Sequence, residues 1–121
     1  MYMTIDISYF KNKLENERAV ITESLEKIGV EDPKTHTWEA VPDMSEGTEA
    51  DPNMLADRAE DYEERSALIR SLGERISEID YALTKFDLGT YGICEKTGEE
   101  MSTERLEANP AARTANAHII L

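Results

Sequence analysis

The sequence contains a single cysteine, Cys94, so an internal disulfide framework is excluded. It has no apolar run long enough to span a membrane. Residues 1–10 lack the basic and apolar regions of a secretory signal peptide. Basic residues are also scarce, with 13 against 26 acidic ones, which gives a formal net charge of −13. Such a chain should be repelled by a phosphate backbone, so we expect a cytoplasmic protein that does not bind nucleic acid directly.

Two stretches carry apolar residues at the three- and four-residue spacing of an amphipathic helix. The first runs from residue 4 to residue 28, with Thr4 or Asp6 as its N-cap, and the second runs from residue 51 to residue 88. A helix as long as the second, with one narrow apolar stripe, needs a partner helix. The sequence therefore predicts a mainly α-helical fold in which residues 1–88 form a long antiparallel hairpin, a two-helix coiled coil.

Residues 29–50, between the two predicted helices, show no apolar periodicity. They contain Pro33, Pro42 and Gly47 together with many acids, which is typical of a long solvated connection. Trp38 argues against a wholly irregular segment, because a large aromatic side chain in a polar loop more often anchors the loop than binds a ligand. We expect this connection to form the tip of the hairpin.

Residues 89–121 read as a small, turn-rich C-terminal lobe that is separate from the hairpin. Within it, residues 103–108 are predicted to form a short helix capped by Ser102, and residues 111–121 could form another. A lobe of this size has little hydrophobic core. It must therefore be held either by a metal ion or by packing against the base of the hairpin.

The lobe also carries a distinctive motif, G-T-Y-G-I-C-E at residues 89–95 followed by R-L-E-A-N-P-A-A-R at residues 105–113. With the long helix before it, this motif resembles the DksA/TraR family of bacterial transcription regulators over about residues 51–118. The resemblance implies a coiled-coil hairpin on a lobe that contains a four-cysteine zinc finger. It also implies binding to RNA polymerase without contact to DNA, with the hairpin entering the secondary channel and acting through acidic residues at its tip.

The zinc-ligand positions implied by this resemblance fall on Cys94, Thr97, Ala115 and His118. Only Cys94 and His118 can ligate zinc, whereas a structural zinc site takes four protein ligands. We therefore expect a degenerate zinc-finger knuckle that holds no metal and is closed by apolar packing. The residues predicted to supply this packing are Tyr91, Ile93, Met101, Leu106, Ile119 and Ile120.

The family's acidic tip signature, D-x-x-D-x-A at the start of the second helix, is half present. Asp57-Arg58-Ala59 supplies the second acid and the alanine, and Met54 stands at the position of the first acid. A carboxylate near a helix end can hydrogen-bond to a partner or approach a Mg²⁺ ion held by other groups. We predict Asp57, Arg58 and Ala59 as the partner-binding residues. The alternative is a solvated acidic face shared with Glu60, Asp61, Glu63 and Glu64.

The basic contacts that some family members use for the nucleotide ppGpp fall here on Glu78, Asn109 and Ile119. None of the three is positively charged, so we expect no ppGpp binding at that site. We also expect no enzyme, because the chain shows no nucleophile–base pair, phosphate loop or paired metal ligands.

Two hypotheses for the function are left. The first is a regulator that binds RNA polymerase in its secondary channel, and the alternative is an interaction protein that has kept the fold but has another protein partner. The chain is expected to be a monomer or a weak homodimer, the latter through unpaired apolar stripe residues or the Ile119-Ile120-Leu121 end.

Overall fold

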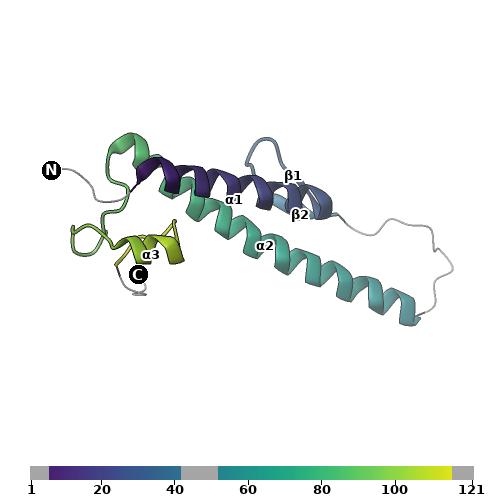
Figure 1. Ribbon diagram of the computed structural model, residues 1–121. Coiled ribbons are helices and arrows are strands. Elements are labelled where there is room, and N and C mark those ends of the chain that lie inside the picture. Colours follow the sequence, from purple (N-terminus) through teal and green to yellow (C-terminus); the bar gives the residue numbers. More distant parts are fainter. Residues whose placement is uncertain (1–5, 42–51, 116–121) are drawn as a thin grey trace. The chain divides into compact units, whose positions relative to one another are not determined.

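The computed structural model describes residues 6–41 and 52–115 (Figure 1). The elements in chain order are helix α1 (Ile7–Ile28), strands β1 (Gly29–Glu31) and β2 (Trp38–Ala40), and helices α2 (Pro52–Leu88) and α3 (Thr103–Ala108). The prediction of a mainly α-helical chain is confirmed, with a small two-stranded sheet added to it. No helix within the described ranges combines the length and the apolar character needed to cross a bilayer.

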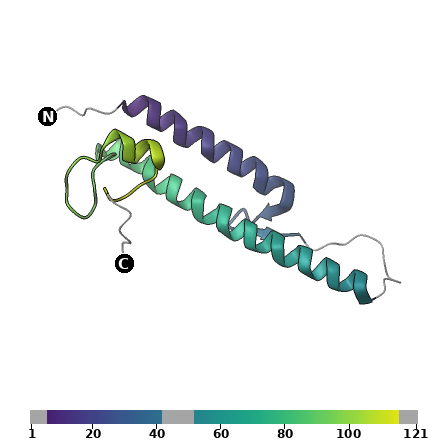
Figure 2. The same cartoon turned by 60° about the horizontal axis from the view of Figure 1, so that its bottom comes forward.

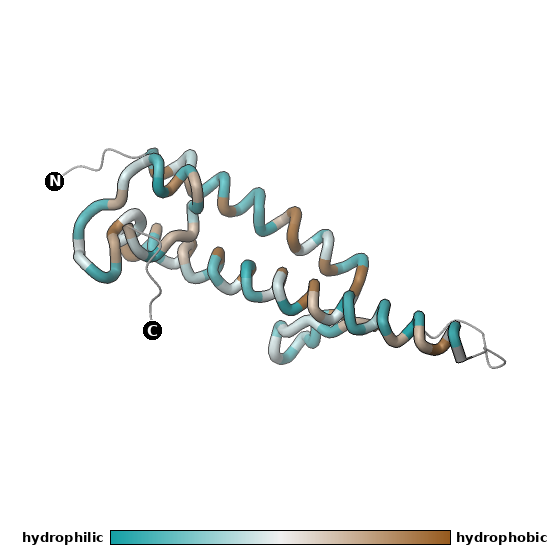
Figure 3. Tube along the Cα trace, turned by 90° about the horizontal axis from the view of Figure 1, so that it is seen from below, coloured by the Kyte–Doolittle hydropathy of each residue, from teal (hydrophilic) through white to brown (hydrophobic). Residues whose placement is uncertain are grey.

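The two long helices lie where the apolar periodicity predicted them (Figure 2). Apolar positions recur along both helices between hydrophilic ones (Figure 3). Asp6 caps α1, because its side chain accepts a hydrogen bond from the Tyr9 N–H at 3.1 Å. Thr4 and Asp51, the other predicted N-terminal positions, lie outside the described residues. The buried stripe residues of the two helices are Phe10, Leu14, Ile21, Leu25, Ile69 and Ile79.

The segment after α1 forms a β-hairpin, which corrects the prediction of an irregular connection over residues 29–50. Strands β1 and β2 pair antiparallel, with Gly29 opposite Ala40 and Glu31 opposite Trp38. Asp32 organises the turn, since its N–H donates to the Thr37 carbonyl at 2.8 Å and its carbonyl accepts from the His36 N–H at 2.7 Å. Residues 42–50 of the predicted connection lie outside the described part of the chain.

The chain divides into two compact units, and each long helix contributes to both. One unit comprises residues 20–75 and contains the β-hairpin. There, a Cβ atom added at Gly29 would lie 2.6 Å from the Glu39 carbonyl oxygen and 2.9 Å from Ile69 Cδ1. The Glu39 backbone oxygen of β2 therefore leaves no room for a side chain at residue 29, and the Ile69 side chain of α2 lies next to the same position.

The other unit comprises residues 1–19 and 76–121. Its α3 helix begins at Ser102, whose side chain accepts a hydrogen bond from the Arg105 N–H, as predicted. Tyr9 and Lys13 of α1 both contact the Glu107 carboxylate of α3, at 3.2 and 3.3 Å. These contacts hold the short helix against α1 within this unit.

The predicted helix over residues 111–121 is not present at residues 111–115, and its remaining residues lie outside the described part of the chain. Asn109 explains the difference, because its side chain and its carbonyl accept hydrogen bonds from the N–H groups of Ala111 and Ala112. These bonds build a turn in place of a helix. The coiled-coil pairing and the division into domains at residues 1–88 and 89–121 stay predictions.

Candidate functional site

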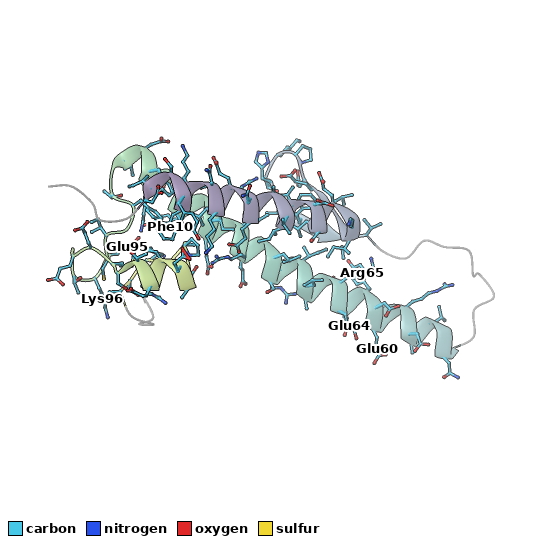
Figure 4. The ribbon with its side chains drawn as sticks, in the orientation of Figure 1. Phe10, Glu60, Glu64, Arg65, Glu95 and Lys96 are labelled. Atoms are coloured by element: carbon cyan, nitrogen blue, oxygen red, sulfur yellow. The ribbon has the colours of Figure 1, made fainter. Side chains whose placement is uncertain are left out.

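The predicted partner-binding residues lie near the beginning of α2. Asp57 and Ala59 are exposed, and Arg58 is half-buried and engaged in a further interaction. The neighbouring acids Glu60 and Glu64 are also exposed and extend away from the helix (Figure 4). This end of α2 therefore presents carboxylates that a partner can reach, with Asp57 among them.

The apolar stripe of α2 is partly exposed near the beginning of the helix and becomes buried further along. Leu55 is 54% exposed and Tyr62 is 38% exposed, whereas Ile69, two turns further on, is buried. Arg65 lies between these regions, where it donates to the Val41 carbonyl at 2.7 Å and stands 5.8 Å from the centre of the Tyr62 ring. The contact between Arg65 and Val41 was not predicted, because it depends on the β-hairpin that the apolar pattern did not reveal.

The loop between α2 and α3 forms a tight knuckle around Cys94. The Cys94 N–H donates to the Glu99 carbonyl and the Gly98 N–H donates to the Cys94 carbonyl, both at 2.8 Å. Ile93 and Glu100 form a bridge beside them. Gly98 has a φ of 78°, a left-handed conformation that favours glycine, and this is the local reason that the chain can reverse here.

The structure brings together three of the four predicted zinc positions. The Cys94 side chain is buried, and its Sγ accepts a hydrogen bond from the Ala115 N–H at 3.3 Å. Hydrogen bonds from the Thr97 side chain and from the Ala115 backbone lower the pKa of the Cys94 thiol to about 7. His118, the fourth position, lies outside the described residues.

These side chains do not fit a closed structural zinc site. Cys94 supplies one sulfur ligand, Thr97 supplies a hydroxyl that interacts with that sulfur, and Ala115 offers a backbone donor where a ligand would be needed. Across residues 6–41 and 52–115, no three His, Cys, Asp or Glu side chains gather in a way that could hold a metal ion.

A cluster of charged side chains lies beside the knuckle and was not predicted. Glu95 lies in the loop between α2 and α3 (Figure 4) and forms two ion pairs. Its Oε2 lies 2.6 Å from Lys85 Nζ, and its Oε1 lies 2.7 Å from Arg113 Nη2. Arg113 and Lys85 also lie 4.5 and 5.0 Å from the centre of the Tyr81 ring. The hydrogen bond from Arg113, followed by that from Lys85, lowers the pKa of Glu95 to about 2.

Aromatic packing forms the apolar part of the same unit. Tyr91 is buried, its ring stacks on Phe86 with centroids 4.1 Å apart, and its hydroxyl donates to the Pro110 carbonyl at 2.7 Å. Burial raises the pKa of Tyr91. Of the residues predicted to pack the lobe, Tyr91, Met101 and Leu106 are buried and Ile93 is half-buried, whereas Ile119 and Ile120 lie outside the described residues.

The positions that the resemblance assigned to a nucleotide offer no cationic side chain among the described residues. Glu78 is exposed on α2 and engaged in another interaction, and Asn109 supports the turn after α3. Ile119 lies outside the described part of the chain. Neither Glu78 nor Asn109 carries the positive charge that a polyphosphate requires.

Comparison with known proteins gave several related sequences, and no family model matched the chain. The chain is 36% identical over 110 residues to an uncharacterized protein of Aquifex aeolicus, which covers 85% of this chain and 66% of that protein. It is 58% identical over 40 residues to general stress protein 16O of Bacillus subtilis, covering 33% of this chain and 24% of that protein.

A third relative is the RNA polymerase-binding transcription factor DksA of Caulobacter vibrioides. It is 44% identical over 61 residues, covering 48% of this chain and 43% of that protein. The chain thus spans about two thirds of the Aquifex relative and less than half of the other two.

Among solved structures, the chain is similar to transcription factor DksA2 from Pseudomonas aeruginosa. The TM-score is 0.63 at 21% sequence identity, over 88% of this chain and 74% of that chain, which shows a shared fold. The shared fold, together with the sequence match to DksA over about half of the chain, supports a DksA/TraR-like family for this protein.

Proposed function

We propose that this protein regulates transcription by binding RNA polymerase in its secondary channel, without contacting DNA. In this proposal the two long helices act as a coiled-coil hairpin, and the beginning of α2 is the end that enters the channel. Asp57, Arg58 and Ala59 make the contacts there. The observation that carries the proposal is the exposure of Asp57 and Ala59 near the start of α2, in a chain of a DksA/TraR-like family.

The physical role of Asp57 follows from its position. A carboxylate in the second turn of a helix, open to solvent, can accept hydrogen bonds from a partner or stand near a Mg²⁺ ion that the partner holds. Met54 replaces the first acid of the family signature, so a single carboxylate carries this contact. We further propose that the protein acts without zinc and without ppGpp, since neither site has the side chains that those ligands require.

The test is binding of the full chain to RNA polymerase from the source organism, in competition with a known secondary-channel ligand, combined with transcription in vitro. The unmodified protein should bind RNA polymerase, should be displaced by the secondary-channel ligand, and should change the transcript yield. Asp57→Asn removes the charge while keeping the size, and it should reduce the effect on transcription by tenfold or more, by analogy with the loss of a charged hydrogen bond.

Asp61→Asn is the matched control, because Asp61 lies one turn after Asp57 on the same helix and is also exposed. It makes the same change of charge and should leave the effect on transcription intact. Absence of binding at micromolar concentrations, or equal activity of the two variants, would reject the channel mechanism.

One observation favours the alternative, an interaction protein with another protein partner. Leu55 and Tyr62 are both partly exposed on one face of α2, seven residues apart, and such apolar positions are typical of helix-docking surfaces. Tyr62→Ser distinguishes the two functions. If it abolishes capture of a protein partner other than polymerase while Asp57→Asn has no effect, the fold serves that other partner.

A further inference from the structure

The knuckle around Cys94 needs a connection between two chain segments, which a zinc ion would provide in the zinc finger that the resemblance implies. The turn at residues 94–97 must be joined to the segment at residues 113–115, which follows α3 in the chain. In a four-ligand zinc site, bonds from both segments to one ion make this connection. Because the side chains here do not fit that ion, another interaction must close the lobe.

We propose that an ion-pair clamp centred on Glu95 closes the lobe in place of the metal. The Glu95 side chain accepts from Arg113 Nη2 at 2.7 Å and from Arg113 Nε at 3.0 Å. A backbone hydrogen bond also joins these two residues, because the Glu95 N–H donates to the Arg113 carbonyl at 2.8 Å. These bonds join the same two segments that the metal would join.

Lys85 extends the clamp to α2. Its side chain is only 9% exposed, and its Nζ lies 2.6 Å from Glu95 Oε2. A lysine that is this deeply buried requires a counter-ion, and in this chain Glu95 supplies it. The clamp therefore ties the knuckle to the end of α2 as well as to residue 113, so a single carboxylate holds three segments of this unit together.

Tyr81 contacts both cations of the clamp. Its ring lies within 5.0 Å of both cations that bind Glu95, a distance at which the aromatic face attracts positive charge. The three charged side chains differ in exposure, with Lys85 the most buried and Arg113 the most open. Partly buried pairs of this kind are screened less by salt than surface pairs.

Cys94 has a secondary role in this arrangement. Its sulfur is buried and accepts the Ala115 N–H, so this hydrogen bond adds another connection between the same two segments. Because the clamp takes the place of the metal in this proposal, the stability of the lobe should be insensitive to chelators. This inference concerns closure of the lobe and does not depend on the binding of polymerase.

Thermal unfolding of the full chain tests the clamp. The protein as purified should contain no stoichiometric zinc by native mass spectrometry, and EDTA should leave its Tm unchanged. Glu95→Gln keeps the size of the side chain but removes its charge, and it should lower the Tm by about 5–10 °C, the shift expected when a charged hydrogen bond is lost in a domain of this size.

Glu99→Gln is the matched control, because it makes the same chemical change at an exposed position of the same loop. It should shift the Tm by no more than about 1 °C, as is usual for surface substitutions. A fall in Tm with EDTA that zinc reverses would overturn the proposal, as would equal effects of the two substitutions. If Glu95→Gln does not fold, zinc content and the response to EDTA of the unmodified protein still decide between clamp and metal.

Discussion

Glu95 forms ion pairs with two cations from different parts of the chain. Protonation of its carboxylate should therefore change the unfolding free energy of the protein with pH. The Arg113 hydrogen bond, ahead of that from Lys85, lowers its pKa from 4.5 to about 2 in the folded state. Because the folded pKa is the lower one, its contribution to stability is complete above pH 4.5 and is lost as the pH falls toward 2.

Urea unfolding of the unmodified protein and of Glu95→Gln at several pH values checks this expectation. The glutamine cannot be protonated in this range, so the difference in unfolding free energy should be about 1–3 kcal/mol at pH 7, the usual worth of charged hydrogen bonds. It should shrink steadily below pH 4.5. A difference that stays constant down to pH 2.5 would show that the carboxylate charge is not what stabilises the lobe.

The candidate residues differ in how far the sequence could predict them. The position of Cys94 beside Thr97 and Ala115 followed from the spacing of the family motif, and the structure brings these residues together. The pairing of Glu95 with Lys85 and Arg113 could not be predicted. Local periodicity carries no information on which charged residues meet after the chain has folded.

The β1–β2 sheet depends on the absence of a side chain at Gly29. It is the first residue of β1, and a Cβ atom added there would meet the Glu39 backbone and the Ile69 side chain. Gly29→Ala would place a methyl group 2.6 Å from a backbone oxygen that cannot move independently of β2. We expect a loss of about 1–3 kcal/mol in unfolding free energy, the usual cost of overpacking.

Chemical denaturation measures this loss, and Val30→Ala is the control. Val30 is the next residue of β1 and is exposed, so its truncation should change the unfolding free energy by less than about 0.5 kcal/mol. Equal stabilities of Gly29→Ala and the unmodified protein would mean that the Glu39 backbone of β2 does not lie this close to residue 29.

At the level of elements, the helices were predictable and the β-hairpin was not. The stripes of α1 and α2 extend over many turns, so their period stands out from the sequence. Strands β1 and β2 have three residues each, too few to display an alternation. Their turn is fixed by hydrogen bonds at Asp32 and by a left-handed conformation at His36, which a pattern of apolar residues does not record.

The net charge of −13 is a property of the whole molecule, and it predicts repulsion from nucleic acid. Lys85 and Arg113, two of its 13 basic residues, are already paired with Glu95, so they are not available to neutralise phosphates. Cationic proteins bind DNA more tightly as the salt concentration falls, because they release counter-ions. An acidic protein should show the opposite tendency, since lower salt strengthens repulsion.

Fluorescence anisotropy with a labelled duplex should therefore show no binding of the full chain at 10 µM protein, at either about 50 or about 150 mM salt. A basic DNA-binding protein measured under the same conditions provides the positive control and should bind more tightly at the lower concentration. Binding of this chain that strengthens at low salt would reveal a basic surface able to overcome the net charge. Transcription effects would then have to be tested for direct contact with the promoter, because polymerase binding alone would no longer account for them.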